Sequence, residues 1–373
     1  MFSSENPEMK ELVPYYYTIF WFLCMLITIS QCNAIGSLRN YGALFRRDDY
    51  QPILFLSFFI ILFWGFRPVH YLFGDTVVYN DMYRMLQIEG TGIIDDHSDW
   101  LFYSFMAFCA PIMDINYFFV IIMCLYVAVM FYGCRKLDFS HGATLMLFCI
   151  GAFSFYGYAV NGIRNGVACS FVILAIAGVC KGERVWPIVF SFIAIGCHKS
   201  TALPLFCMFF TYFVRNPKLM FVVWFGAIGI SLVFGDTIAD LLTLLNYDDR
   251  LVSELKADEA DGVMMEHRFR WDFLLYSAMP ILLGWYTLFK RGFYNNTYII
   301  LLGSYMYANA FWVLTIRAIF SNRIAYLSWF LYPIVLAYPL FNLPVFEKDH
   351  SQKVAWILLV HFGFTTVMWM LGK

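Results

Sequence analysis

Long apolar runs separated by short polar turns recur along the chain from Tyr15 to the C-terminus. A helix needs about 20 apolar residues to cross a bilayer, and several of these runs approach that length. The pattern therefore predicts an all-α polytopic membrane protein, with a bundle of about 11–13 transmembrane helices in one integral membrane domain, residues 1–373. The candidate spans are Tyr15–Ser30, Ile53–Phe66, Tyr117–Gly133, Thr144–Ala159, Gly166–Cys180, Val185–Cys197, Thr201–Val214, Leu219–Gly235, Asp272–Lys290, Tyr298–Thr315, Ile324–Phe341 and Val354–Leu371.

Several apolar runs are short for a straight span. Val185–Cys197 and Thr201–Val214 are expected to form a re-entrant pair or two tilted helices. Leu101–Met113 is expected to be an interfacial or re-entrant helix.

Two longer polar segments interrupt the apolar pattern. Residues 67–100 carry an apolar and a polar helical face, which predicts a helix lying at the membrane interface. The two faces consist of Val78, Met82 and Met85, and of Asp75, Tyr79 and Tyr83. Residues 236–271 are polar and long for a connector, so this segment is a candidate lid.

Composition supports the membrane class and removes several others. Hydrophobic residues make up 61% and charged residues 14% of the chain, and the mean hydropathy is +0.66, which is unlike a soluble domain. A net charge of −1 argues against a general nucleic-acid binder. The 10 cysteines lie mostly inside apolar runs without a C-x-x-C pair, so we expect small core residues and no metal site.

Lysine and arginine are concentrated in one set of short turns, which the positive-inside rule assigns to the cytoplasm. This set consists of Arg39, Arg46, Arg47, Arg135, Lys136, Lys181, Arg184, Arg215, Lys218, Lys290, Arg291, Lys348 and Lys353. Both termini and both long polar segments then fall on the outer side.

The outer side nevertheless holds arginines, several of them close to a predicted span. They are Arg67, Arg84, Arg164, Arg268, Arg270, Arg317 and Arg323. Guanidinium groups bind phosphate bidentately and stay charged in a poor solvent, so the set predicts an anionic ligand such as a lipid pyrophosphate. The alternative is snorkelling to lipid headgroups combined with pairing to nearby acids.

Further polar groups accompany Arg164 at the predicted outer end of its helix. Asn161 shares the NGIRNG segment with Arg164, and His198 and Lys199 end the next helix after a KGER turn. The short turn makes the two helices antiparallel neighbours, so Arg164 and His198 are expected to face one cavity. His198 is a candidate proton acceptor, with a hydrogen-bonded interface residue as the alternative.

The segment GDTVVYNDMY adds the carboxylate of Asp75 and the phenols of Tyr79 and Tyr83. Carboxylates and aromatic rings bind sugars by hydrogen bonding and stacking. The same residues also suit the cap and the membrane contact of an interfacial helix.

Five segments in order resemble motifs of the Wzy/EpsG family of bacterial O-antigen and exopolysaccharide polymerases. They are GDTVVYNDMY, DWLFYSF, NGIRNGVA, CHKSTALPL and NRIAYLSWFLYP, within roughly residues 60–340. Asp99 stands where the family usually has Glu, and Asn165 where Gln is common.

The resemblance implies glycosyl transfer between lipid-linked repeat units at the periplasmic face of the bacterial inner membrane, in a multi-pass bundle similar to the GT-C or O-antigen ligase architecture with a periplasmic cavity. Donor and acceptor would be oligosaccharides linked to undecaprenyl pyrophosphate. Membrane lipids, a chain-length regulator and a flippase are the other partners, and neither a nucleotide nor another cofactor is needed. Two alternatives from other classes are a flippase for lipid-linked sugars and a membrane O-acyltransferase acting on the glycan.

Overall fold

The computed structural model describes residues 7–38, 50–90, 99–244, 269–318 and 321–371. Within these ranges every regular element is helical, which confirms the predicted all-α membrane class. The chain forms two compact units, one of Met1–Ala202 with Ala337–Lys373 and one of Leu203–Leu336. We refer to them as unit 1 and unit 2.

Unit 1 contains ten α-helices and two short 3₁₀ helices in its described part. The α-helices are α1 (Pro7–Gly36), α3 (Tyr50–Gly65), α4 (Thr76–Glu89), α5 (Trp100–Cys109), α6 (Ile115–Leu137), α7 (Gly142–Ile150), α8 (Phe153–Val160), α9 (Ile163–Cys180), α10 (Val185–Cys197) and α18 (His350–Met370). The 3₁₀ helices are η1 (Tyr71–Phe73) and η3 (Lys199–Thr201).

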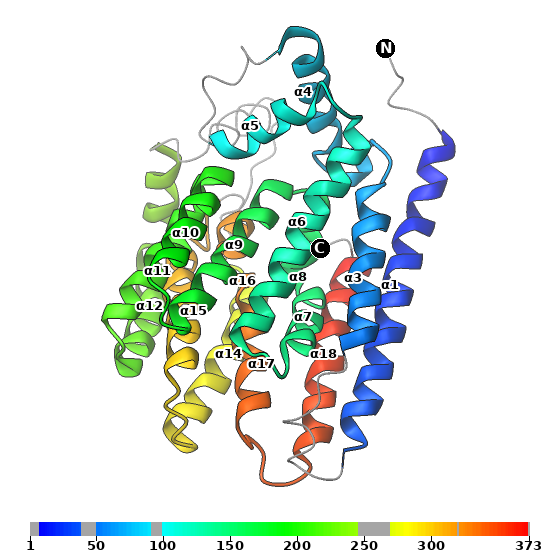
Figure 1. Cartoon of the computed structure of the whole chain (residues 1–373). Helices are drawn as coiled ribbons and strands as arrows, with labels where there is room; N and C mark the ends of the chain where they lie inside the picture. The colour runs from blue at the N-terminus through cyan, green and yellow to red at the C-terminus, as the bar shows by residue number, and fades with distance from the viewer. Residues whose placement is uncertain (1–6, 39–49, 91–98, 245–268, 319–320, 372–373) are drawn as a thin grey trace. The chain divides into compact units, whose positions relative to one another are not determined.

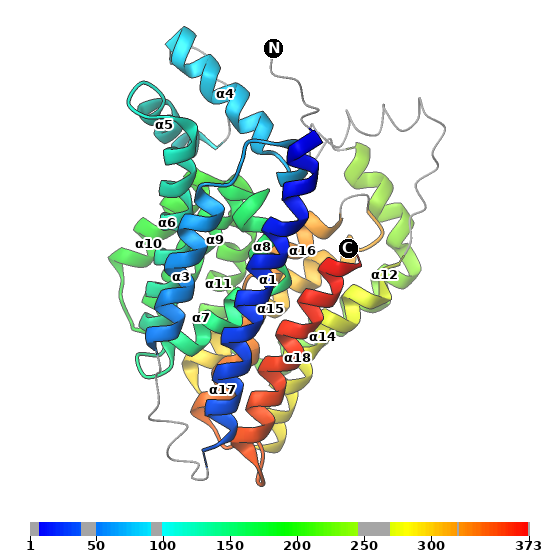
Figure 2. The same ribbon diagram turned by 90° about the vertical axis from the view of Figure 1, so that its right-hand side faces the viewer.

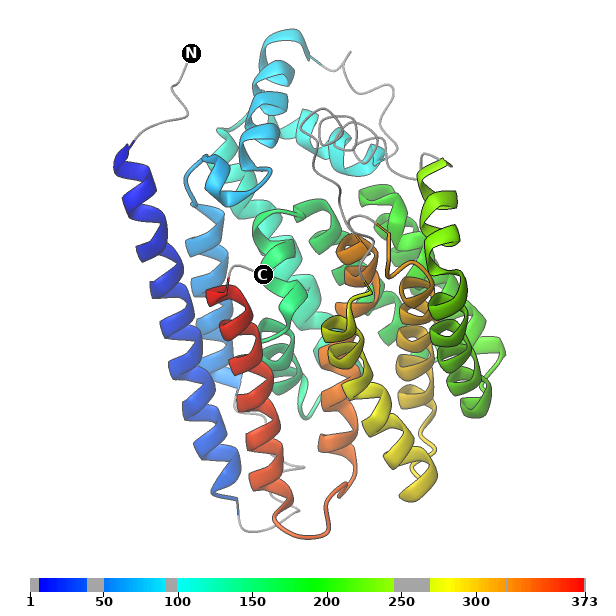
Figure 3. The ribbon, with the colours of Figure 1, turned by 180° about the vertical axis from the view of Figure 1, so that it is seen from behind.

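Unit 2 contains α11 (Ala202–Phe213), α12 (Pro217–Leu244), α14 (Trp271–Trp285), a π-helical turn at Tyr286–Lys290, α15 (Asn296–Leu314) and α16 (Ser321–Trp329). Helix α17 (Tyr332–Asn342) crosses the boundary between the units. In unit 2, α15 packs against α12, α14 and α16 (Figure 3).

Eight helices of the described chain are long and apolar enough to cross a membrane, or nine if α7 and α8 form one span. Shorter apolar helices add to this set: α3, α5 and α10. At ten residues, α5 is too short to span, and it lies across the end of unit 1 next to α4 (Figure 1). Helix α4 lies in the segment 67–100, and the placement of this helix at the membrane interface stays a prediction.

The predicted span Thr144–Ala159 is not one straight helix, because α7 and α8 are bent by 75° at a short break. The break frees backbone carbonyls that a straight helix would pair, and α18 supplies donors for them. His361 Nε2 lies 2.9 Å from the carbonyl oxygen of Phe148, and Thr365 Oγ1 donates to that of Gly151 at 2.8 Å. Both donors belong to a helix that runs antiparallel to α1 (Figure 2).

Helix α9 is the centre of unit 1, and 72% of its spanning window is buried. It packs between α6 and α10, which run antiparallel to one another. At one end of these helices Lys136 Nζ pairs with Glu183 Oε2 at 2.6 Å, next to other basic turn residues. The opposite end carries α4, α5 and the polar residues described next.

Candidate functional site

The N-terminus of α4 is fixed to the end of α8 by a glycine and an amide. Asn161 Oδ1 accepts the backbone N–H of Asp75 at 2.9 Å. Gly74 precedes this bond with φ of +65°, and a Cβ at Gly74 would lie 2.5 Å from the same oxygen. Only glycine suits this backbone and this close approach. The contact sets the direction of α4, and with it the position of Tyr79.

A second close approach brings α5 against α10. A Cβ at Gly196 would lie 2.9 Å from Leu101 Cβ and 3.1 Å from the Trp100 ring, so the missing side chain lets the first turn of α5 contact the last turn of α10. Asp99, the residue before α5, is thereby placed beside His198, the residue after α10.

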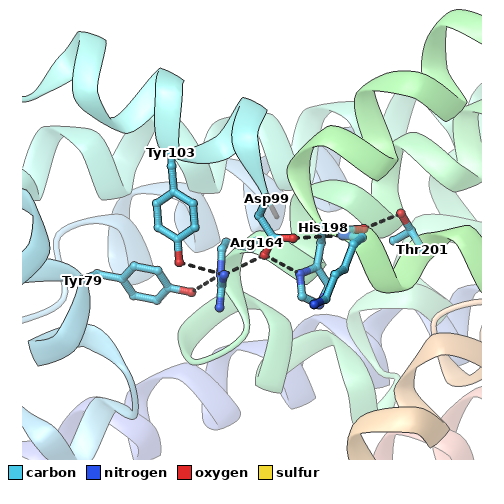
Figure 4. A network of polar contacts seen from close by, with 7 residues as sticks. Tyr79, Asp99, Tyr103, Arg164, His198 and Thr201 are labelled. Carbon is cyan, nitrogen blue, oxygen red and sulfur yellow. Dashed lines mark hydrogen bonds and ion pairs between the residues drawn. The ribbon is translucent and has the colours of Figure 1, made fainter. Parts of the chain in front are cut away.

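The Asp99 carboxylate collects three hydrogen bonds (Figure 4). Its Oδ2 accepts from Arg164 Nη1 at 2.7 Å and lies 2.8 Å from His198 Nδ1. Its Oδ1 accepts the backbone N–H of Lys199 at 3.0 Å. The side chain is only 3% exposed, so these donors compensate a carboxylate that is almost completely withdrawn from water.

Arg164 is held from two further sides. Its Nε donates to the Tyr79 hydroxyl at 3.1 Å, and its Nη1 also donates to the Tyr103 hydroxyl at 2.8 Å. Within the described part of the chain, Nη2 makes no hydrogen bond, and 18% of the side chain is exposed. The guanidinium is therefore fixed through Nε and Nη1, and Nη2 keeps its N–H groups for a ligand.

His198 ends α10 in an extended conformation, with φ of −159° and ψ of 115°. Its backbone carbonyl accepts the Thr201 hydroxyl at 2.7 Å and the Thr201 N–H at 3.1 Å, which fixes the turn. The imidazole contacts Asp99 through Nδ1 and is 16% exposed. No described residue hydrogen-bonds to its Nε2.

The electrostatics of the cluster favour an ionised Asp99. Burial, the largest effect, raises the pKa of this carboxyl, but the hydrogen bond and charge of His198, followed by the Lys199 N–H and the charge of Arg164, together lower it below its usual value. Asp99 is thus an anion that links a cation and an imidazole.

Arg67, predicted as a ligand residue, is fully buried and braces the framework. Its guanidinium donates to the carbonyl oxygens of Trp64 at 2.7 Å and Val160 at 3.3 Å, and it lies 4.3 Å from the Phe119 ring centroid. Burial lowers its pKa to about 10, so the group stays protonated at neutral pH. From this position it supports the ends of α3 and α8 and is not exposed to a ligand.

The remaining predicted residues of unit 1 differ in their surroundings. Tyr83 is buried and its hydroxyl donates to the carbonyl oxygen of Met113 at 2.9 Å, which ties α4 to the turn after α5. Arg84 is exposed on α4, and Asp75 is half-buried at its start. The Lys199 side chain is exposed, while its backbone N–H serves Asp99.

The other predicted arginines belong to unit 2 or to segments outside the described residues. Arg270 pairs with Asp272 at 2.8 Å, and Arg317 pairs with Asp236 at 3.0 Å. Arg323 is exposed on α16. Arg268 and most of the proposed lid 236–271 fall in residues 245–268, which are not described; the start of that segment continues α12. Ligand binding by these arginines stays a prediction.

Sequence reasoning missed two members of the cluster, Asp99 and Tyr103. In the sequence, Asp99 is a departure from the DWLFYSF motif, and Tyr103 is one of the residues of that motif. Their spacing of four residues places them on one helical face, which was the available signal. Among the described residues, no group of three His, Cys, Asp or Glu side chains is arranged to hold a metal ion.

The fold and the cluster together define a polytopic helical membrane protein with a buried ionic site at one end of unit 1. The family model that matches the chain is that of the EpsG family, over residues 52–372, and the chain belongs to this family. No curated protein and no solved structure shows significant similarity to it. Membership supports a general role of the polysaccharide polymerase type.

Proposed function

We propose that this protein is a polymerase that joins repeat units linked to undecaprenyl pyrophosphate by glycosyl transfer. The observation that carries the proposal is the cluster of Asp99, Arg164 and His198, in which a cation and an imidazole are held at one carboxylate oxygen. Family membership supports the class of reaction, and the cluster supplies groups suited to its chemistry.

The reaction requires a leaving group and a nucleophile. The hydroxyl oxygen of the incoming unit attacks the anomeric carbon of the growing glycan and forms the new glycosidic bond. The bond from that carbon to the pyrophosphate oxygen breaks, and undecaprenyl pyrophosphate leaves with the electron pair. Arg164 binds the departing anion through Nη2, and His198 Nε2 takes the proton of the acceptor hydroxyl.

Helix direction supports a periplasmic location for this chemistry. Arg135 and Lys136 end α6, and Lys181 and Arg184 lie between α9 and α10, all at the end of these helices opposite to the site. The positive-inside rule assigns basic short turns to the cytoplasm, so the cluster faces the periplasm in the bacterial inner membrane.

Deletion of the gene, followed by gel analysis of surface glycan length, tests the proposal. Loss of a polymerase leaves one repeat unit on the lipid, and a plasmid copy restores long chains. Loss of a flippase leaves no glycan outside, and loss of an O-acyltransferase leaves chain length intact. Either of the last two results would contradict the proposal.

A further inference from the structure

One carboxylate oxygen serves two groups with different chemical roles. Asp99 Oδ2 lies 2.8 Å from His198 Nδ1 and 2.7 Å from Arg164 Nη1. The backbone N–H of Lys199 holds the other oxygen at 3.0 Å, so the carboxylate is fixed in rotation about its side chain. The carboxylate is almost fully buried and is therefore placed to act on its two neighbours and not on a substrate.

The Asp99 carboxylate determines which nitrogen of the His198 imidazole carries the proton. An ionised carboxylate only accepts hydrogen bonds, so His198 Nδ1 must carry a proton in this contact. In the neutral imidazole the other nitrogen, Nε2, is then unprotonated and has a lone pair available. The opposite tautomer would place two lone pairs against each other at Nδ1.

The same oxygen restrains Arg164. With Nη1 on Asp99 and Nε on Tyr79, the plane of the guanidinium is determined by two contacts on different edges. Because both groups are bound to one atom, the spacing between the imidazole and the guanidinium is fixed without contact between them.

We propose that Asp99 is a positioning residue, which holds His198 as its Nδ1–H tautomer and fixes Arg164 beside it. The inference rests on the proposed function, since it assigns Asp99 a role toward the two residues that act in the proposed reaction. Asp99 takes no part in bond making. Through this contact it keeps His198 Nε2 in the form that accepts a proton.

The tautomer can be observed without an activity assay. Protein labelled with ¹⁵N-histidine in lipid bilayers gives separate NMR signals for protonated and unprotonated ring nitrogens, and His198→Gln identifies the signals of His198. His350 is an internal reference of the opposite kind, because its Nδ1 lies 3.3 Å from the N–H of Phe346 and its Nε2 2.9 Å from the carbonyl oxygen of Leu340.

We expect neutral His198 to carry its proton on Nδ1, whereas His350 carries it on Nε2. In Asp99→Asn the amide can donate to Nδ1, so the proton of His198 is expected to move to Nε2. A wild-type His198 protonated on Nε2 would overturn the proposal, whatever the protein catalyses.

Rescue by the conservative variant separates a positioning role from a merely structural one. In purified protein with a lipid-linked repeat unit, Asp99→Asn should lower kcat by about 10²–10⁴-fold. Asp99→Glu keeps the charge and should restore part of the activity.

The outcomes distinguish this inference from the proposed function. If wild-type protein forms no polymer while His198 has the expected tautomer, the function fails and the positioning stands. If wild-type protein polymerises and Asp99→Asn reduces turnover while His198 keeps its proton on Nδ1, Asp99 is only structural. Unchanged turnover in Asp99→Asn would likewise overturn its positioning role.

Discussion

His198 combines two features that suit proton transfer, because one ring nitrogen is held by Asp99 and the side chain is partly exposed. A positioned base contributes on the order of 10²–10⁴-fold, whereas an orienting hydrogen bond does not need a titratable group. Glutamine can hydrogen-bond but cannot take up the proton. We therefore expect His198→Gln to be nearly as inactive as His198→Ala in a purified assay, with binding of the lipid-linked donor retained. Substantial turnover by the glutamine variant would leave His198 with an orienting role only.

Arg164 makes contacts that a lysine cannot reproduce. The guanidinium reaches the hydroxyls of Tyr79 and Tyr103 and the carboxylate of Asp99 from two nitrogens, whereas lysine has one. Arg164→Lys should reduce polymer strongly at normal protein levels, measured by glycan gels and immunoblotting.

The matched control for this exchange is Arg215→Lys. Arg215 is exposed and its Nε donates to the carbonyl oxygen of Tyr212, so its loss should have little effect on polymer. Wild-type polymer in Arg164→Lys would rule out a requirement for the fork.

The sequence predicted individual residues of the site better than it predicted which of them contact one another. Arg164 and His198 stood out because charge and imidazole are rare next to apolar runs, and the short turn after α9 indicated antiparallel neighbours. Asp99 did not, because an aspartate before a helix has the appearance of an ordinary N-cap. Its contact with His198 joins residues 99 positions apart, and no local pattern encodes such a contact.

At the scale of elements, the start of α4 depends on one glycine. Gly74→Ala combines a positive φ with a clash against Asn161, so α4 must shift and carry Tyr79 away from Arg164. Gly90 ends the same helix with φ of +75° and no atom within 4 Å of its Cβ position, so Gly90→Ala has a similar backbone cost without the clash.

We expect Gly74→Ala to lose most polymer and Gly90→Ala to keep most of it, at equal protein levels on immunoblots. Equal activity of the two variants would mean that the contact between Gly74 and Asn161 does not position the site.

The break between α7 and α8 shows why a hydropathy pattern missed a bend. The apolar run continues through Gly151 and Ala152, so nothing in it interrupts the predicted span. The break leaves the carbonyl oxygen of Gly151 without a partner in its own helix. Its donor is the hydroxyl of Thr365 on α18, more than 200 residues away in the sequence. Hydropathy describes local composition, whereas the bend depends on the contact between the α7–α8 break and α18.

Thr365→Val should therefore destabilise the protein, because it leaves the carbonyl oxygen of Gly151 without this donor. The expected loss is about 1–3 kcal/mol, measured by thermal unfolding in detergent. Thr366→Val is the control, since the Thr366 hydroxyl bonds at 3.0 Å to the carbonyl oxygen of Phe362 in its own helix, which already serves the helical ladder. Similar unfolding temperatures for both variants would contradict a special role for the contact with α18.

At the scale of the whole molecule, the class of fold followed from composition, and the number of spans followed less well. Eight helices pass the criteria of length and hydropathy in the described chain, against about 11–13 expected from apolar runs. The difference arises from α3, α10 and α11, which are apolar but short, and from the bent pair of α7 and α8. Apolar composition predicts contact with lipid or with a buried core, and only length separates a span from a shorter helix.

Orientation in the membrane is the property of the whole chain on which the proposed periplasmic location of the chemistry depends. Asp81 is exposed on α4 at the site end, and Lys181 is exposed in the turn after α9 at the opposite end. In a background in which the exposed Cys124 is replaced by serine, single cysteines at these two positions report the two sides. A membrane-impermeant maleimide should label Asp81→Cys in intact cells, because basic turns favour the cytoplasm and leave the opposite end outside. Lys181→Cys should react only after the inner membrane is permeabilised. The reverse pattern would place the cluster of Asp99, Arg164 and His198 in the cytoplasm, where a lipid-linked unit that has already been exported cannot reach it.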